Sequence, residues 1–280
     1  MSSSGADGRW GGGAVSAPEA SPGFAGAWHC WLDPLPRPGA WNMATDQALL
    51  ERAARRGERW LRLYRWHPSC LSFGRHERAR ARYDRARIGS LGLDVVRRPT
   101  GGRAVWHARE LTYAVAMPAD EVGGIRAAYL EIHRMLCDAL RSLGIPAVLA
   151  DVGVTPSLDA GACFARPVGG EILVTGRKVV GSAQLREAGG LLQHGSILLD
   201  DDQSLVRSVT RGEAPADGST PLSRLAGHRL DAHRVAESLV AAAAARWAGA
   251  WSGPDGHDHV LAEAQEHLPR FVSEAWTWRA

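Results

Sequence analysis

The chain has 280 residues with 33 basic and 30 acidic side chains, and 45% of its residues are hydrophobic, which is the composition of a soluble globular protein. No run approaches the roughly 18 apolar residues that a membrane span needs, and residues 1–26 lack the basic and apolar regions of a signal peptide. The four cysteines are widely spaced without CxxC pairs, which argues against both a disulfide scaffold and a zinc ribbon. We therefore expect a cytoplasmic protein without a metal site.

Lys178 is the only lysine among the 33 basic residues, and all the others are arginine. Drift in a GC-rich genome explains the scarcity of lysine. An arginine, however, cannot lower its pKa, lose a proton or act as a compact point charge. The one lysine that remains is therefore a candidate for chemistry.

The first half of the chain predicts a tail, one helix and three strands. Residues 1–26 are rich in Gly, Ser and Ala and predict a disordered tail. Residues 41–56 have helical periodicity, and Gly57 follows where a helix would end. Residues 60–66 alternate and predict a strand, as do 93–97 and 111–117, which flank a glycine-bearing loop.

The second half predicts further helices and a hairpin. Residues 125–143 form the clearest helix, with an apolar stripe from Ile125 through Ile132, Leu136 and Leu140. Strands at 171–175 and 179–184 flank a hairpin turn at Gly176-Arg177; a further strand is expected at 192–199 and helices at 231–248 and 259–269. Hairpins mixed with helices indicate an α/β (α+β) fold rather than a strictly alternating one.

The first segment that could carry chemistry is the loop Arg97-Arg-Pro-Thr-Gly-Gly-Arg-Ala-Val-Trp-His107. Its proline and two glycines make a tight turn whose backbone N–H groups can approach an anion or a carbonyl oxygen closely. The alternatives are an ordinary hairpin turn and, for the histidine, a structural role. The candidate substrate-binding residues here are Arg97, Arg98, Thr100, Gly101, Gly102, Arg103 and His107.

The second segment is 176–184, which holds Lys178 just past the hairpin turn among apolar neighbours. Partial burial there would depress the lysine's pKa. The side chains of the following Gly-Ser-Ala are too small to cover the backbone, as expected where a substrate lies against a strand. A surface lysine beside a turn is the alternative. The candidate binding residues of this strand are Gly181, Ser182, Ala183 and Gln184.

Two further features are a loop cysteine and an interrupted strand. Cys163 follows a flexible stretch, and a thiolate nucleophile needs such access together with a neighbouring positive charge. Cys137, in contrast, lies within an apolar helix and fills the core. His194 and Gly195 interrupt the strand at 192–199, which indicates either a close backbone approach or a β-bulge.

Residues 75–98 hold eight arginines against three acidic residues, Glu77, Asp84 and Asp94. This basic stretch is either a solvated helical face or a surface for an acidic protein or for nucleic acid. No nucleic-acid-binding motif accompanies it, so nucleic acid ranks last.

In this order, seven stretches resemble the biotin/lipoate protein ligase superfamily, in particular the LipM-type octanoyltransferases. The matching stretches are 42–50, 65–74, 97–107, 110–113, 162–164, 176–184 and 192–199. The resemblance implies the catalytic-domain fold of that superfamily over residues 27–250, with mixed, mostly antiparallel sheets flanked by helices. It also implies that residues 251–280 form a short helical tail packed on the domain.

Three activities occur in this superfamily: ATP-dependent lipoate ligation, octanoyl transfer from acyl carrier protein, and octanoyl amidotransfer between lipoyl-domain proteins. Cys163 precedes Lys178 where the LipM-type family places its acyl-accepting cysteine, and Thr-Gly-Gly-Arg103 lacks the third glycine usual in ligases. The resemblance thus implies that Cys163 carries the acyl group and that Lys178 lowers its pKa. No cofactor is implied; ATP and Mg would be needed only by a ligase.

The implied partners are octanoyl-acyl carrier protein, which the basic stretch 75–98 could dock, and lipoyl-domain proteins. The lipoyl-domain proteins are the glycine cleavage H protein and the E2 subunits of 2-oxoacid dehydrogenases. Backbone N–H groups near Gly101 or near Gly181 would stabilise the oxyanion. Lys178 or His107 could relay the acceptor's proton. We expect neither a nucleic acid nor a membrane partner, and a monomer.

Overall fold

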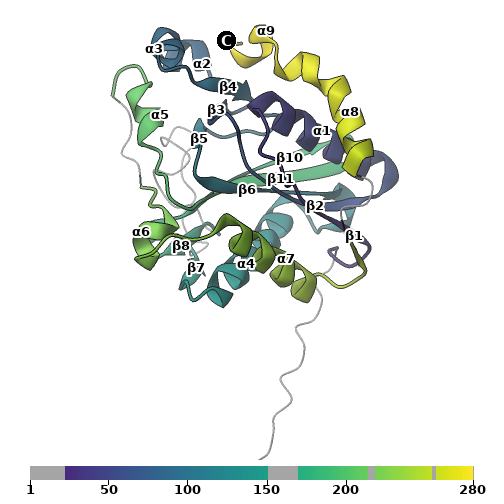
Figure 1. Ribbon diagram of the computed structural model, residues 1–280. Helices are drawn as coiled ribbons and strands as arrows, with labels where there is room; N and C mark the ends of the chain where they lie inside the picture. Colours follow the sequence, from purple (N-terminus) through teal and green to yellow (C-terminus); the bar gives the residue numbers. More distant parts are fainter. Residues whose placement is uncertain (1–22, 151–169, 214–217, 254–256, 280) are drawn as a thin grey trace, which may run out of the picture.

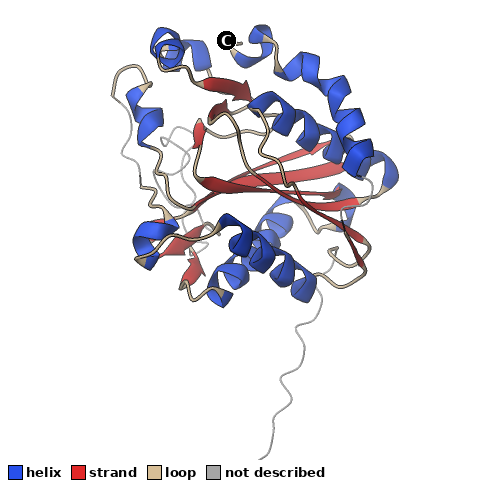
Figure 2. Cartoon of the chain, viewed as in Figure 1, coloured by secondary structure: helices blue, strands red, loops and turns tan. Residues whose placement is uncertain are grey.

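A six-stranded sheet with helices on both faces runs through the middle of the molecule (Figures 1 and 2). The computed structural model describes residues 23–150, 170–213, 218–253 and 257–279. In spatial order the strands are β10 (Val180–Glu187), β11 (Gly190–Leu198), β6 (Glu110–Pro118), β2 (Arg59–Tyr64), β1 (Trp28–Leu32) and β12 (Trp251–Ser252). The first four pair antiparallel, whereas β1 is parallel to both of its neighbours. The mixed, mostly antiparallel arrangement confirms the expected fold class.

Strand β6 is buried on both faces because its side chains alternate between two cores. Tyr113 and Val115 enter one apolar cluster, whereas Ala114 and Ala116 enter the other. Successive side chains of a strand point to opposite faces, so this alternation places the large residues on one side and the alanines on the other. The small alanines leave room for a helix to lie close to the sheet.

Two helices cover each face of the sheet. Helices α4 (Ile125–Ser142) and α7 (Ala232–Arg246) pack on one face, and α1 (Gly39–Arg56) and α8 (His257–Phe271) on the other (Figure 1). The helical periodicity predicted all four. In α4, Ile132, Leu136 and Leu140 are buried as expected, but Ile125 is 47% exposed because the first turn lies outside the core.

Two small sheets flank the large one. The first contains β4 (Asp94–Arg97), β3 (Cys70–Phe73) and β5 (Val105–His107), and around it lie α2 (Ala79–Arg82), α3 (Arg85–Ser90), α5 (Ser204–Ser208) and α9 (Glu274–Thr277). The second contains β7 (Ala147–Leu149), β8 (Ile172–Val174) and β9 (Arg177–Lys178). The turn at Gly176 is confirmed, but the second strand of its hairpin is only Arg177–Lys178. The expected partner strand at 179–184 lies instead in the large sheet as β10, paired with β11. The short α6 (Leu222–Ala226) and the 3-10 turn η1 (Ala119–Glu121) complete the described elements.

Residues near both ends of the described chain pack against the large sheet. Phe24 is only 2% exposed, and its ring centroid lies 5.0 Å from that of Trp247, so packing begins before residue 27. At the other end β12 joins the large sheet beside β1, and α8 covers α1. Residues 251–253 and 257–279 are therefore integral to the domain. No helix in the described residues is long and apolar enough to span a membrane.

Candidate active site

A pocket of about 370 Å³, including its open mouth, lies between the large sheet and the β4-β3-β5 sheet. It is lined by side chains from α1, β2, β5, β6, β10, β11 and the nearby loops. Its described lining is Met43, Tyr64, Trp66, Arg98, Val105, His107, Thr112, Gly181, Ser182, Ala183, His194, Gly195 and Ser196. The pocket brings together residues from both of the segments that the sequence singled out, 97–107 and 176–184, and from the interrupted strand at 192–199.

Gly195 is needed because two strands and a ring meet at its position. A Cβ atom there would lie 2.7 Å from the carbonyl oxygen of Gly181 and 2.8 Å from the ring of Tyr113. The interruption in the strand is therefore a site of close approach. The group that approaches is the neighbouring strand β10, because Ser182 is the register partner of Gly195.

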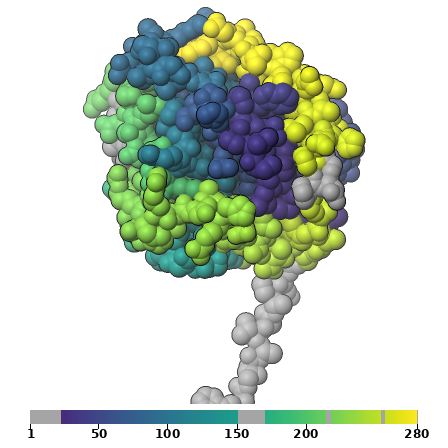
Figure 3. All heavy atoms as spheres, viewed as in Figure 1, coloured from purple at the N-terminus to yellow at the C-terminus, as the bar shows by residue number. Residues whose placement is uncertain are grey.

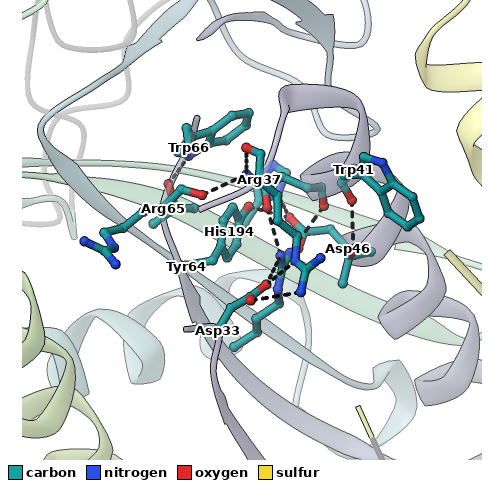
Figure 4. Close-up of polar contacts among 12 residues, drawn as sticks. Asp33, Arg37, Trp41, Asp46, Tyr64, Arg65, Trp66 and His194 are labelled. Carbon is teal, nitrogen blue, oxygen red and sulfur yellow. Dashed lines mark hydrogen bonds and ion pairs between the residues drawn. The ribbon is translucent and has the colours of Figure 1, made fainter. Parts of the chain in front are cut away.

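His194 links the loop before β5 to helix α1. Its Nε2 lies 2.6 Å from Thr100 Oγ1, and its Nδ1 lies 2.7 Å from Asp46 Oδ2. Since a carboxylate accepts, Nδ1 carries a proton and donates to Asp46. Tyr64 also donates to Asp46 Oδ2, at 2.8 Å. The imidazole therefore has a fixed orientation on the pocket wall (Figure 4).

A buried arginine holds Asp46 in place. The Arg62 guanidinium is fully buried, donates to Asp46 at 3.1 Å and to Asp33 at 2.9 Å, and lies 3.9 Å from the centroid of Tyr64. Burial raises the pKa of Asp33, but hydrogen bonds and charge from Arg37 and Arg62 outweigh it and lower that pKa overall. Burial raises the pKa of Tyr64 well above its usual value. A chain of charges thus runs from Arg37 to the pocket (Figure 4).

Arg98 shapes the pocket wall by binding the chain's own backbone. Its Nη1 donates to Ser72 Oγ at 2.6 Å, and its Nη2 donates to the carbonyl oxygens of Gly101 and Arg103 at 3.1 and 2.8 Å. Ser72 Oγ in turn lies 2.7 Å from His107 Nε2, and the His107 ring stacks on Trp66. Burial lowers the pKa of His107, so the imidazole is neutral near pH 7.

Arg97 does not reach the pocket. Its guanidinium is buried and donates six hydrogen bonds to backbone carbonyl oxygens in residues 74–77 and 276–279. It therefore joins the loop after β3 to the C-terminal helix α9. Its donors are directed to the backbone and not to the described pocket lining, and a role of Arg97 in substrate binding stays a prediction. Arg98 donates to carbonyl oxygens of the loop that contains Gly101, Gly102 and Arg103. These three residues are not part of the described lining of the pocket.

Lys178 is buried, as its apolar neighbours predicted, and is 4% exposed. Its ammonium forms an ion pair with Glu171, whose side chain is also buried. Glu171 is the second described residue after the gap at 151–169, so Lys178 lies close to the end of that segment. Cys163, the expected nucleophile, falls within 151–169 and lies outside the described residues.

A second buried network, absent from the sequence prediction, runs behind the pocket. His133 on α4 contacts Ser182, which contacts Tyr113 at 2.7 Å. Gln193 donates to the Tyr113 hydroxyl at 2.8 Å, and Gln184 donates to Gln193 at 2.8 Å. Gln184 therefore supports the pocket from behind and does not line it. The only feature of the sequence that could have indicated a role for His133 is that it is a polar residue next to Ile132, on a helix with an apolar stripe.

Asp46 and Arg62 were also missed as site residues. Asp46 lies in the stretch 42–50, whose run of polar residues on a helix that packs against a sheet was the available signal. No group of three His, Cys, Asp or Glu side chains among the described residues could hold a metal ion.

Known proteins resemble this chain in sequence over most of its length. The sequence model of the lipoyl protein ligase A/B catalytic domain matches residues 38–244. The octanoyltransferase LipM of Kyrpidia tusciae is 38% identical over 262 residues, which cover 86% of this chain and 94% of that protein. The LipM octanoyltransferase of Exiguobacterium sibiricum is 35% identical over 263 residues, with the same coverage of both chains.

Solved structures share the fold. A lipoate-protein ligase A bound with ATP has a TM-score of 0.74 at 20% identity and covers 90% of this chain and 98% of its own. A bipartite lipoate protein ligase from Thermoplasma acidophilum has a TM-score of 0.70 at 18% identity and covers 91% of this chain and 96% of its own. The fold is therefore that of the lipoate-protein ligases. The chain belongs to the lipoyl protein ligase A/B family, which confirms the resemblance seen in the sequence.

Proposed function

We propose that this chain is an octanoyltransferase that moves octanoate from acyl carrier protein to the lysine of a lipoyl domain. The observation that carries the proposal is the 38% identity to a LipM octanoyltransferase over 94% of that protein's length. The pocket supports it, because Met43, Trp66 and Val105 supply apolar walls for an acyl tail. The acceptors would be lipoyl-domain proteins such as the glycine cleavage H protein and 2-oxoacid dehydrogenase E2 subunits.

The proposed reaction has two acyl transfers. The Cys163 thiolate attacks the octanoyl thioester, the new S–C bond forms, and the carrier's thiolate leaves. The lysine amine of the lipoyl domain then attacks the acyl-cysteine, the N–C bond forms, the cysteine thiolate leaves and the amine loses a proton. The first exchange replaces one thioester by another, so no ATP or other cofactor is required.

In the proposed reaction the described residues act at two places, the Lys178–Glu171 ion pair and the pocket. Lys178, held by Glu171 close to the end of the segment that carries Cys163, supplies the positive charge that favours a thiolate. The pocket beside Gly181–Ala183 receives the acyl chain, and backbone N–H groups of this edge strand can hold the thioester carbonyl oxygen. Neutral His107 on the pocket wall and Lys178 are the two groups that the sequence suggested for relaying the amine's proton.

One assay separates this function from its alternatives. Octanoyl-acyl carrier protein and a lipoyl domain are incubated with the enzyme, with and without ATP, and masses are read by intact-protein mass spectrometry. We expect an octanoyl adduct on Cys163 and modification of the lipoyl domain without ATP. Modification that requires ATP and survives Cys163→Ala would instead establish a ligase. Transfer only from an octanoylated lipoyl-domain protein would establish an amidotransferase.

A further inference from the structure

The basic stretch at residues 75–98 is not one cationic surface, because half of its arginines are occupied. Arg75 pairs with Glu187 at 2.6 Å, and Arg85 pairs with Glu274. Arg97 and Arg98 are buried and donate to backbone carbonyl oxygens. The expectation that the whole stretch docks an acidic partner is therefore too broad.

Two arginines of α2 and its N-cap remain available. Arg78 and Arg80 are exposed, and no carboxylate in the described part of the chain lies within ion-pair distance of either. Arg82, half-buried on the same helix, lies 3.9 Å from Glu77, whose carboxylate also accepts from Tyr83 at 2.5 Å. This short segment thus presents cations without matching exposed acids.

A distant segment of the chain adds two more arginines at the same place. Arg207 in α5 and Arg211 just after it are exposed, and neither has a carboxylate partner among the described residues. The backbone N–H of Arg211 donates to the carbonyl oxygen of Arg82 at 2.8 Å, and that of Asp84 donates to Val209 at 2.8 Å. A β-bridge between Tyr83 and Thr210 fixes the two segments side by side.

We name this surface the arginine ledge, and it consists of Arg78, Arg80, Arg82, Arg207 and Arg211. The blue α2 lies at the upper left of the molecule, and the green α5 lies below it on the left side (Figures 1 and 3). The nearest acids in sequence are Glu77, Asp84, Asp202 and Glu213; of these Asp84 caps α3, Asp202 accepts from the backbone N–H of Ser204, and Glu213 alone is exposed. The ledge therefore carries a local excess of positive charge that the net charge of +3 conceals.

The ledge adjoins the wall of the pocket. Gln203, one residue before α5, accepts from the backbone N–H of Trp106 at 2.7 Å and donates to its carbonyl oxygen at 3.0 Å. The neighbours of Trp106 on β5, Val105 and His107, both line the pocket. A partner bound at the ledge would therefore sit beside the pocket in which the acyl group is placed.

We propose that the arginine ledge is the docking surface for the acidic acyl carrier protein that donates the acyl thioester. Unpaired like charges repel one another, and a cationic surface beside an active site attracts an anionic partner and speeds its association. Such a surface acts on the donor protein and not on the thioester itself. The inference rests on the proposed function.

The test reverses the charges of the ledge and changes the donor. The variant Arg78→Glu/Arg80→Glu/Arg207→Glu/Arg211→Glu is compared with the wild type for Cys163 acylation, using octanoyl-acyl carrier protein or the small thioester octanoyl-pantetheine. We expect the KM for the carrier to rise by about 10-fold or more at low salt, with kcat/KM for octanoyl-pantetheine unchanged. In the wild type the KM for the carrier should rise with added salt, and this dependence should be weaker in the variant.

The double variant Arg78→Glu/Arg80→Glu is also measured, and its control with the same change in charge is Arg126→Glu/Arg234→Glu, which reverses two exposed arginines on α4 and α7. This control should leave the KM for the carrier unchanged. An unchanged KM in the ledge variant, or an equal loss with octanoyl-pantetheine, overturns the ledge and leaves the proposed function standing. A wild-type enzyme that accepts octanoate from the small thioester but never from the carrier overturns both.

Discussion

The Nε2 atom of His133 lies 2.8 Å from Ser182 Oγ, at the back of the pocket. On the other side of the ring, Nδ1 lies 2.7 Å from the carbonyl oxygen of Gly170. A carbonyl oxygen can only accept, so Nδ1 carries the proton and Nε2 accepts from the Ser182 hydroxyl. Tyr113 must then donate to Ser182, which fixes the direction of every bond from Gln193 to Gly170.

This buried histidine makes stability depend on pH. Burial lowers the pKa of His133 to about 3, whereas in the unfolded chain it is near 6.5. Below that unfolded value the unfolded chain binds a proton that the folded protein excludes, so the free energy of unfolding falls as the pH drops from 6.5 towards 3. We expect His133 to contribute up to about 1.4 kcal/mol per pH unit in this window.

Urea unfolding of wild type and His133→Gln at pH 7, 6 and 5 measures this contribution. The free energy of unfolding of the variant should fall less steeply with decreasing pH. His107→Gln should act in the same direction, because burial also lowers the pKa of His107. If the free energy of unfolding falls equally with pH in wild type and in His133→Gln, the pKa of His133 is the same in the folded and the unfolded chain, and the prediction is wrong.

Lys178→Arg keeps the positive charge at a buried site but changes its shape and its hydrogen-bonding geometry. We expect the rate of Cys163 acylation to fall by at least about 100-fold, the lower range for a positioned acid–base group, with the fold intact by circular dichroism. The neighbouring Arg177→Lys is the control, since Arg177 is exposed. Turnover near the wild-type rate in Lys178→Arg would remove this lysine from the mechanism.

Asp46→Asn separates the two partners of the buried Arg62. The change takes away one of its two carboxylates and the charge that His194 faces. We expect a loss of about 3 kcal/mol in the free energy of unfolding, together with slower acyl transfer. Asp33→Asn removes the other carboxylate and leaves His194 untouched, so stability should fall while acyl transfer at a permissive temperature is retained. Equal losses of activity would contradict a role for His194.

Gly195→Ala tests the close approach of β10 and β11. The added Cβ would meet the Gly181 carbonyl oxygen and the Tyr113 ring, so we expect a loss of about 1–3 kcal/mol by urea unfolding. Gly89→Ala in α3 is the matched control, because nothing lies within 4 Å of its Cβ position. That substitution should be neutral or stabilising. The prediction fails if both variants unfold at the same urea concentration as the wild type.

The long elements of the fold could be predicted because their patterns are local. The helices α1, α4, α7 and α8 and the strands β2, β6 and β11 each carry enough periodicity within one segment. Strand β1 was missed because it follows the glycine-rich tail, and β3 and β5 because four or three residues hold too little alternation. Which strands share a sheet is decided by contacts between distant segments.

The site residues also fall into those that a local pattern predicts and those that only contacts between distant segments define. Arg98, His107 and the residues 181–183 and 194–195 were found because each lies in a segment with unusual glycine or charge content. Asp46, Arg62 and His133 were not, since each looks ordinary in its own helix or strand. They become site residues only when α1, β2 and α4 pack on the sheet and their polar atoms have no water to bind.

The six carbonyl acceptors of Arg97 have a consequence for the order in which the protein can fold during synthesis. Three of them belong to Trp276, Thr277 and Arg279, near the end of the chain. A ribosome releases these residues after all the strands have been made. The loop after β3, whose carbonyl oxygens at residues 74, 75 and 77 accept from the same guanidinium, is therefore joined to α9 only after residues 276–279 have been synthesised.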